Sequence, residues 1–233
     1  PDVGGAVMKR ALRRFLDALF PPRCALCAEP AELCDEGMCT SCRGALSGLN
    51  AKSVHLNRGL LGECHIDEAV AVYAYREPVK GAIHRLKFYG RKRAGICLGA
   101  CMARAVDPGV LAGVDFATAV PVTKRRRNAL GYNHAEVLAG EFCRLSSLPC
   151  RFDVLLKVVD NTSQSQLSAG ERAANVRGVY TVAKDAELSG KCVLLIDDVL
   201  TTGSTLNECA AALKEAGARR VVCLTAAHPD FLQ

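Results

Sequence analysis

Two adjacent carboxylates, Asp197 and Asp198, close an apolar run at 193–196 and precede a loop of small residues. The run predicts a buried strand, and ligands of an open parallel sheet bind beyond the carboxyl ends of its strands. Carboxylates suit sugar hydroxyl groups and the waters of a hydrated Mg²⁺. The loop at 199–205, which contains Gly203, leads into a helix and offers backbone N–H groups that suit a phosphate. A sugar phosphate is therefore the expected ligand.

The loop differs from two common nucleotide-binding motifs. It lacks the G-x-x-x-x-G-K spacing of a Walker A loop, and its single glycine does not make a dinucleotide fingerprint. A purely structural interpretation of the acid pair is that one carboxylate caps the loop and the other is solvated. The combination of strand, acid pair, hydroxyl-rich loop and helix favours a binding site instead.

A second set of reactive residues lies near the amino end, where eleven residues separate Cys24-x-x-Cys27 from Cys39-x-x-Cys42. Four thiolates in this spacing can complete a tetrahedral Zn²⁺ site, which leaves no open position for catalysis. Such a site stabilises a segment too small to bury its own core. Cys34 is a fifth candidate, either free or in place of Cys39. The alternatives are two chance pairs, or a redox pair, which is disfavoured because neither CxxC opens a helix after a strand.

The elements that must position the acid pair form an alternating series after residue 66. Apolar runs without polar alternation predict strands that are covered on both faces, and the amphipathic segments between them predict helices. This alternation is typical of an α/β fold with a parallel sheet. We expect strands at 69–75, 115–122, 192–199 and 219–227, and helices at 79–89, 93–106, 133–147 and 205–217.

The composition sets broad limits on partners. The chain has 233 residues, of which 50% are hydrophobic and 5% aromatic, with no Trp and a formal net charge of +6. The positive excess fits phosphates or nucleic acid, whereas the scarcity of aromatic residues disfavours a base-stacking platform. No run approaches the ~20 apolar residues of a membrane span. The amino end at 6–22 is expected to form an amphipathic helix that docks on the chain itself or, alternatively, on a membrane surface or partner.

The thirteen cysteines favour reduced thiols and a cytoplasmic location, because their number is odd and no export signal is visible. Most of those outside the cluster are expected to be small core residues. The change in composition predicts an amino-terminal helix and zinc module at 1–65, followed by an α/β domain at 66–233.

The segment "VLLIDDVLTTGST" at 193–205 resembles the phosphoribosyl-pyrophosphate (PRPP) loop of type I phosphoribosyltransferases. The resemblance implies that Asp197 and Asp198 bind the ribose 2′ and 3′ hydroxyl groups, with Mg²⁺ bound alongside PRPP. It implies that the loop after them binds the 5′-phosphate; the matching positions are Val199, Thr201, Thr202, Gly203, Ser204 and Thr205. Relatives that act on hypoxanthine or guanine carry an acid at the position of Thr201, and a threonine cannot serve as that general base.

Four segments in order also resemble the ComF family of competence-associated proteins, in which a zinc module precedes this fold. They are "LFPPRCALC" (19–27), "YREPVKGAIHRLKFYGRK" (75–92), "AVPVTKRRRNALGYNHAEVLA" (119–139) and "NTSQSQLSAGERAANVRGVY" (161–180). The chain departs from the family pattern at 130–134, where Leu130 replaces an arginine and His134 replaces a glutamine. It also retains only Cys64 of a second pair of CxxC motifs, so one metal site is the expected number.

The same resemblance implies two further contacts with the diphosphate. A pyrophosphate loop is expected at Val122, Thr123 and Lys124, and a mobile hood is expected to bring Lys87 or Arg91 over the ligand. For each of these side chains the alternative is a solvated basic turn.

Three functions follow from these features. The first is an enzyme that transfers phosphoribosyl from PRPP to an acceptor which the sequence does not specify. The second is a non-catalytic protein that uses the phosphoribosyl site as a sensor, or that binds single-stranded DNA or the competence machinery; the ComF resemblance implies a role in DNA uptake. The third is amidophosphoribosyl or purine salvage chemistry, and Thr201 disfavours its purine version. The oligomeric state is left open.

Overall fold

The protein is seen in a computed structural model, of which residues 20–47, 52–54, 63–158 and 178–229 are described. Most of the amphipathic helix predicted at 6–22 and most of the motif at 161–180 lie outside the described residues. Within the described part of the chain, no helix is long and apolar enough to cross a membrane.

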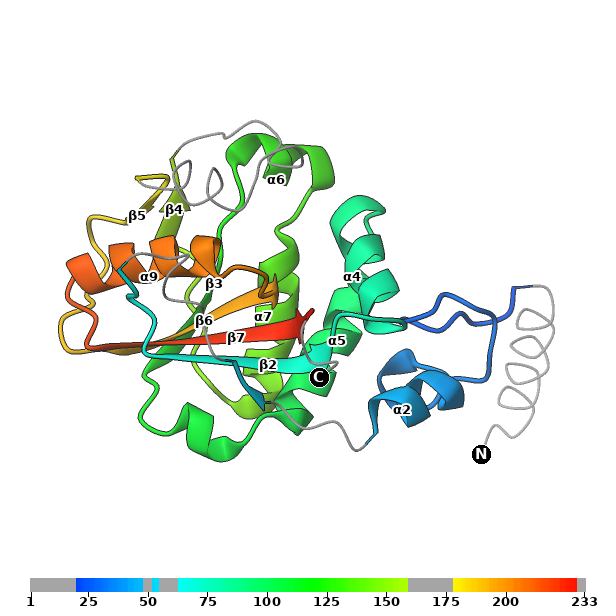
Figure 1. Ribbon diagram of the computed structural model, residues 1–233. Helices are drawn as coiled ribbons and strands as arrows, with labels where there is room; N and C mark the ends of the chain where they lie inside the picture. The colour runs from blue at the N-terminus through cyan, green and yellow to red at the C-terminus, as the bar shows by residue number, and fades with distance from the viewer. Residues whose placement is uncertain (1–19, 48–51, 55–62, 159–177, 230–233) are drawn as a thin grey trace, which may run out of the picture.

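A five-stranded sheet forms the centre of the molecule (Figure 1). Four of its strands are parallel and one short edge strand is antiparallel, in the order β1-β2-β7-β6-β3. The strands are β1 (Lys52–Ser53), β2 (Glu68–Ala74), β3 (Phe116–Ala119), β6 (Cys192–Val199) and β7 (Arg220–His228). The parallel sheet that the alternating pattern predicts is confirmed. Its four parallel strands fall within a few residues of the predicted ranges.

Both faces of the sheet are covered, as the continuous apolar runs require. Alternate residues of β6 enter opposite cores: Leu194 and Ile196 pack in one, and Val193 and Leu195 in the other. The first core includes residues of α4 (Val79–Phe88), α5 (Lys92–Ala105) and α7 (His134–Ser146). The second includes α9 (Ser204–Glu215) and the hairpin of β4 (Leu155–Lys157) and β5 (Tyr180–Val182). Figure 1 shows α9 and α7 on either side of the sheet.

Several short elements are not among the sequence predictions. The basic segment after Pro121 forms a helix, α6 (Lys124–Leu130), in which Thr123 is the N-cap and accepts a hydrogen bond from the Arg126 N–H at 3.2 Å. The side chains of 124–127 are exposed, and the Arg127 guanidinium donates to the Glu136 carboxylate. The others are the β4–β5 hairpin, α2 (Thr40–Leu46) and the 3₁₀ turns at Asp35–Gly37 and Pro108–Leu111.

Most cysteines outside the amino-terminal cluster fill the interior as small apolar side chains, as predicted. Cys192 and Cys223 are fully buried on the central strands, and Cys97 and Cys209 are fully buried on helices. Burial raises the pKa of the Cys192, Cys209 and Cys223 thiols above their ordinary value. These groups therefore stay protonated and unreactive in the folded protein.

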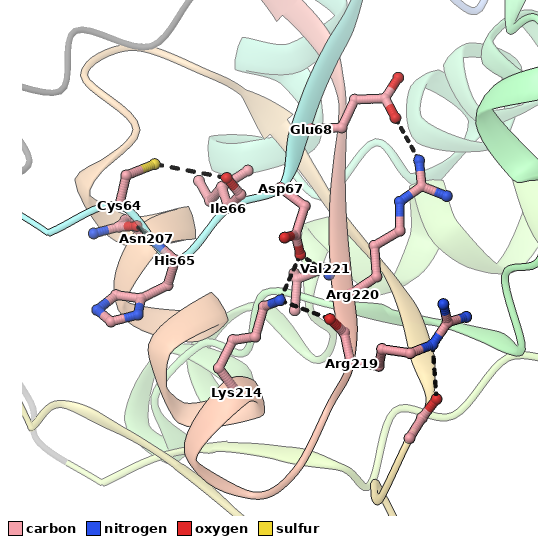
Figure 2. Close-up of polar contacts among 11 residues, drawn as sticks. Cys64, His65, Ile66, Asp67, Glu68, Asn207, Lys214, Arg219, Arg220 and Val221 are labelled. Atoms are coloured by element: carbon pink, nitrogen blue, oxygen red, sulfur yellow. Dashed lines mark hydrogen bonds and ion pairs between the residues drawn. The ribbon is translucent and has the colours of Figure 1, made fainter.

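The segment that enters β2 is tied to the body by a polar network (Figure 2). The Asn207 side chain of α9 accepts a hydrogen bond from the His65 N–H and donates one to the Glu63 carbonyl, both at 2.8 Å. Two residues after His65, an Asp67 carboxylate oxygen accepts from the Val221 N–H at 2.6 Å and lies 2.7 Å from Lys214 Nζ. The domain boundary predicted at residues 65 and 66 falls inside this bound segment, and it stays a prediction.

Candidate functional site

The acid pair occupies the carboxyl end of β6, and both carboxylates are removed from solvent. Asp197 and Asp198 are 9% and 2% exposed. The Asp198 N–H donates to Asp197 Oδ1 at 2.9 Å, which fixes one carboxylate against the backbone of the other. Two carboxylates buried side by side are costly unless cations or a ligand balance their charge.

The loop after the acid pair turns through Gly203, whose φ of +82° lies in the left-handed region that favours glycine. The helix α9 starts at the next residue, and the N–H of Ser204 and its hydroxyl both lie near Thr202 Oγ1, at 3.4 Å and 3.0 Å. Thr201 is exposed and Thr205 is half-buried. The loop and the first turn of α9 thus place backbone N–H groups beside the hydroxyl groups of Thr201, Thr202, Ser204 and Thr205, a suitable environment for an anion.

A cavity of about 720 Å³ connects this loop with the acid pair. It lies at the carboxyl ends of β3 and β6, which pair in parallel, so two strand-end loops meet there. The residues that line it are Lys87, Val120, Pro121, Val122, Thr123, Arg125, Arg126, Ala129, His134, Lys157, Tyr180, Asp197, Asp198, Val199, Leu200, Thr201, Thr202, Gly203, Ser204, Thr205 and Leu206.

Two nitrogen groups face the acid pair. Lys87, near the end of α4, places Nζ 2.7 Å from Asp198 Oδ2. His134, the first residue of α7, places Nε2 3.5 Å from the same oxygen and 4.0 Å from Asp197 Oδ1. Lys87 is therefore paired with the carboxylate that the resemblance assigns to a sugar hydroxyl.

Burial dominates the titration of this cluster. It raises the pKa of Asp197 to about 7, with a further increase from the neighbouring charge of Asp198. It lowers the pKa of His134 to about 4, and Asp198 offsets only part of that change. Burial also acts to lower the pKa of Lys87, but the Asp198 and Asp197 carboxylates outweigh it and raise that pKa above its ordinary value. At neutral pH the site holds a neutral imidazole and an ammonium.

The segment at 130–134 fixes these groups in place. Gly131 ends α6 with a φ of +75°. The Tyr132 hydroxyl then donates to the carbonyl of Leu86, the neighbour of Lys87. Asn133 caps α7 by accepting from the Ala135 N–H at 3.0 Å, and its amide donates to the Val120 carbonyl at 2.9 Å.

The cavity brings together most, but not all, of the predicted site residues. The acid pair, the loop at 199–205, Val122, Thr123 and Lys87 line it. Lys124 and Arg91 are exposed and do not line it; they begin or precede the helices α6 and α5. His134 also lines the cavity, and the sequence pointed to it only as a departure from the ComF pattern.

Polar residues beyond the predicted site residues also line the cavity. Arg125 and Arg126 come from α6, and Lys157 and Tyr180 from the β4–β5 hairpin. The basic run at 123–127 was a signal for the arginines, although not for their helical placement. Nothing in the sequence pairs Lys157 with Tyr180.

The amino-terminal cysteines form a compact cluster. The Sγ atoms of Cys24, Cys27, Cys39 and Cys42 lie within 4.8 Å of one another, with Cys27 and Cys39 3.9 Å apart. Sulfurs bound at ~2.3 Å in a tetrahedron are roughly 3.8 Å apart, so the four fit one Zn²⁺. Although burial alone would raise the pKa of Cys24, N–H groups of Cys27 and Cys39 point at its sulfur and lower that pKa to about 6, which favours the thiolate.

Cys34 lies outside this cluster. Its thiol donates to the Met38 carbonyl at 3.0 Å, whereas Cys39 supplies the fourth sulfur. The alternative in which Cys34 replaces Cys39 is therefore not the arrangement in the structure. The cluster also packs against α5, since Cys24 and Met38 share a core with Leu98.

Comparison with known families agrees with this two-part structure. The profile of the family described as phosphoribosyl transferase domain matches residues 130–229, and that of the double zinc ribbon domain matches residues 15–53. The second match and the four-cysteine cluster together support a structural zinc.

Two curated relatives match over most of their length. Competence protein F of Haemophilus influenzae is 27% identical over 87% of this chain and 95% of its own length. DNA utilization protein YhgH of Escherichia coli K12 is 29% identical over 86% of this chain and 94% of its own length.

A solved structure of glutamine PRPP amidotransferase from B. subtilis matches 57% of this chain at 23% identity, with a TM-score of 0.38. The match spans about a quarter of that protein, 26%. The chain thus combines a phosphoribosyltransferase fold with an amino-terminal zinc ribbon, and it is similar over most of its length to Competence protein F and YhgH.

Proposed function

We propose that the cavity binds PRPP with Mg²⁺ and that the protein transfers the phosphoribosyl group to an acceptor. The observation that carries this proposal is the division of the cavity. Buried carboxylates and, directly after them in the chain, a hydroxyl-rich loop at the start of α9 line it as two adjoining parts. This division matches a ligand that has sugar hydroxyl groups next to a phosphate.

Each part of the ligand has a chemically suitable partner. Asp197 and Asp198 accept from the ribose hydroxyl groups, and Thr201–Thr205 donate to the 5′-phosphate. The backbone at 121–123 and the guanidinium groups of Arg125 and Arg126 provide donors and positive charge for the diphosphate. The carboxylate oxygens also suit the waters of a hydrated Mg²⁺, which would neutralise diphosphate charge when bound.

The chain's contribution to the reaction is positioning and electrostatics. The bond between ribose C1′ and the diphosphate breaks, the acceptor forms a bond to the same carbon and loses a proton, and pyrophosphate leaves. Donors held rigidly around the diphosphate stabilise the charge that grows on it as the bond breaks. Lys87 can stay paired with Asp198 during this step, because a carboxylate has about four acceptor sites and can bind an ammonium and a sugar hydroxyl together.

Calorimetric titration with PRPP and Mg²⁺ tests the site. We expect binding to the wild type and at least about a hundredfold weaker binding to a D197N/D198N double variant, which loses two charge-assisted hydrogen bonds. D185N, at an exposed aspartate that does not line the cavity, is the matched control. Equal affinity of the double variant and the wild type would reject the proposal.

A second candidate function, single-stranded DNA binding, is favoured by one surface feature. His84, Phe88 and Tyr89 gather at the end of α4, with ring centroids 4.8 Å and 5.5 Å from that of His84. Phe88 is 57% exposed and Tyr89 is 65% exposed. Residues 80–93 carry six basic residues and no acid. Exposed rings within a basic surface suit the bases and backbone of a single strand, despite the low overall aromatic content.

This second function fits the names of the two relatives, which refer to competence and DNA utilization. A fluorescent oligothymidine should bind the wild type with an affinity that falls steeply as salt increases. F88A/Y89A should weaken it about tenfold or more, since each stacked base contributes about 1–3 kcal/mol. The matched control F152A, at another exposed ring, should bind as the wild type does. Unchanged binding by F88A/Y89A would reject this role for the surface.

A further inference from the structure

Three side chains from two elements converge at one point of the cavity. His134 starts α7, and Asp197 and Asp198 end β6. One potential ligand atom from each lies within 4.8 Å of the other two, and His134 Nε2 is 3.5 Å and 4.0 Å from the two carboxylates. These separations exceed an ordinary hydrogen bond, so the imidazole is aimed at the carboxylates without a normal bond to them.

His134 is buried with little polar compensation. Its side chain is 9% exposed, Nδ1 is buried without a hydrogen-bond partner, and Nε2, the nitrogen that faces the carboxylates, is 3.5 Å from the nearer one. Burying a polar ring without close partners is unfavourable, and an ion between Nε2 and the carboxylates would give Nε2 such a partner. The ComF pattern has a glutamine here, which would supply a neutral amide but not an imidazole.

The spacing fits three donors of one cation. Nitrogen and oxygen ligands at ~2.0–2.2 Å from an ion lie roughly 3.0 to 4.3 Å from one another. Imidazole nitrogen binds first-row transition metals well, whereas Mg²⁺ prefers oxygen, so replacing an amide by imidazole shifts the preference toward Mn²⁺ and its heavier neighbours. We propose that His134, Asp197 and Asp198 bind a first-row transition-metal ion directly. This deepens the proposed function by assigning the cavity a metal other than hydrated Mg²⁺, but its test needs no PRPP.

Lys87 competes with this ion. Its Nζ lies 2.7 Å from Asp198 Oδ2, the oxygen that is also nearest to His134. The positive charge of the ammonium repels a dication at that oxygen. Removing the ammonium in K87M should therefore increase the affinity for the metal.

Mn²⁺ is the suitable probe, because it is paramagnetic and prefers oxygen and nitrogen to the thiolates of the zinc ribbon. The full chain with its zinc bound would be titrated with Mn²⁺ while the loss of the free-ion electron paramagnetic resonance signal is followed. We expect one Mn²⁺ per wild-type chain, stronger binding by K87M and no measurable binding by D198N. H134Q should bind at least about tenfold more weakly, since even outer-shell metal partners contribute 10- to 100-fold.

The matched histidine control is H65Q, because the His65 ring lies outside the cavity, 4.0 Å from the Glu63 carboxylate. H65Q should bind Mn²⁺ as the wild type does. Spin-echo spectra of the Mn²⁺-loaded wild type should show modulation from one directly bound imidazole nitrogen, and those of H65Q should show the same. This measurement needs no folded H134Q protein.

Each of three results would overturn the metal site. The first is wild-type affinity for Mn²⁺ in H134Q, and the second is bound Mn²⁺ without nitrogen modulation in the wild type. The third is failure of the wild type to bind Mn²⁺ at millimolar concentration. Failure of PRPP binding in the presence of Mg²⁺, with Mn²⁺ binding and nitrogen modulation intact, would reject the proposed function and support the metal site.

Discussion

The ammonium of Lys87 lies 2.7 Å from the 2%-exposed side chain of Asp198, so a cation supplied by α4 balances the acid pair of β6. These residues are 111 positions apart in the chain. The Tyr132 hydroxyl, bonded to the Leu86 carbonyl, holds the end of α4 in this position.

Removal of this internal cation should destabilise the protein. K87M leaves Asp198 buried without its partner, and breaking a buried ion pair costs about 3–5 kcal/mol. We expect urea denaturation at pH 7 to show a loss of about 3 kcal/mol. The loss should be much smaller in a D198N background, and K184M, at an exposed lysine, should be near neutral. An equal loss in both backgrounds would show that the ion pair is not its cause.

The stability of D197N relative to the wild type should depend on pH. Burial raises the pKa of Asp197 from an ordinary value of 3.8 to about 7, so the folded state holds a proton that the unfolded state has lost between these values. The wild type therefore loses stability from this group as pH rises from about 4 to 7. D197N should become progressively more stable than the wild type over that range, by up to a few kcal/mol. A pH-independent difference between the unfolding free energies would contradict this.

A side chain at Gly203 should damage the phosphate loop. Its φ of +82° costs a residue with a Cβ about 1–2 kcal/mol, so G203A should be less stable by about that amount and should bind PRPP more weakly. G140A is the matched control, because a Cβ on Gly140 of α7 meets nothing within 4 Å. It should be neutral or up to about 1 kcal/mol more stable. Thermal unfolding and PRPP titration of both variants distinguish local strain from general sensitivity to alanine.

Zinc content should distinguish Cys39 from Cys34. Of these two residues, only Cys39 contributes a sulfur to the four-cysteine cluster. The Cys34 thiol instead donates to the Met38 carbonyl. C39S should lose about one equivalent of zinc per chain relative to the wild type, and C34S should keep the wild-type content. Elemental analysis after dialysis measures both. The reverse result would assign the fourth ligand to Cys34.

Loss of the Asn207 side chain should loosen the segment before β2. N207A removes hydrogen bonds to the His65 N–H and the Glu63 carbonyl, which should cost about 2 kcal/mol of stability. Hydrogen exchange at His65 should accelerate more than exchange in β6. N128A, at an exposed asparagine of α6, is the control and should change neither. Unchanged exchange at His65 in N207A would show that this contact does not hold the segment.

Local patterns in the sequence were enough to predict the main elements. The apolar run before Asp197 predicts a strand that is covered on both faces, and Gly203 predicts the turn into α9. The cysteine spacing likewise identified the ligands of the cluster.

The remainder of the site depends on contacts between distant segments. His134 reaches the acid pair because Asn133 anchors the start of α7 to Val120, beside the strand that pairs with β6. Lys157 and Tyr180 belong to strands too short for their pattern to separate them from a loop. Such placements follow from the pairing of strands, which composition and periodicity do not encode.

The buried cysteines make the lifetime of the protein depend on its redox surroundings. Cys97, Cys143, Cys192, Cys209 and Cys223 have no access to oxidants while the fold is intact. Unfolding exposes these thiols together, and each regains the reactivity of a free cysteine. Mispaired disulfides would then prevent the sheet from re-forming, so a brief opening that is harmless under reducing conditions becomes permanent inactivation under oxidising ones.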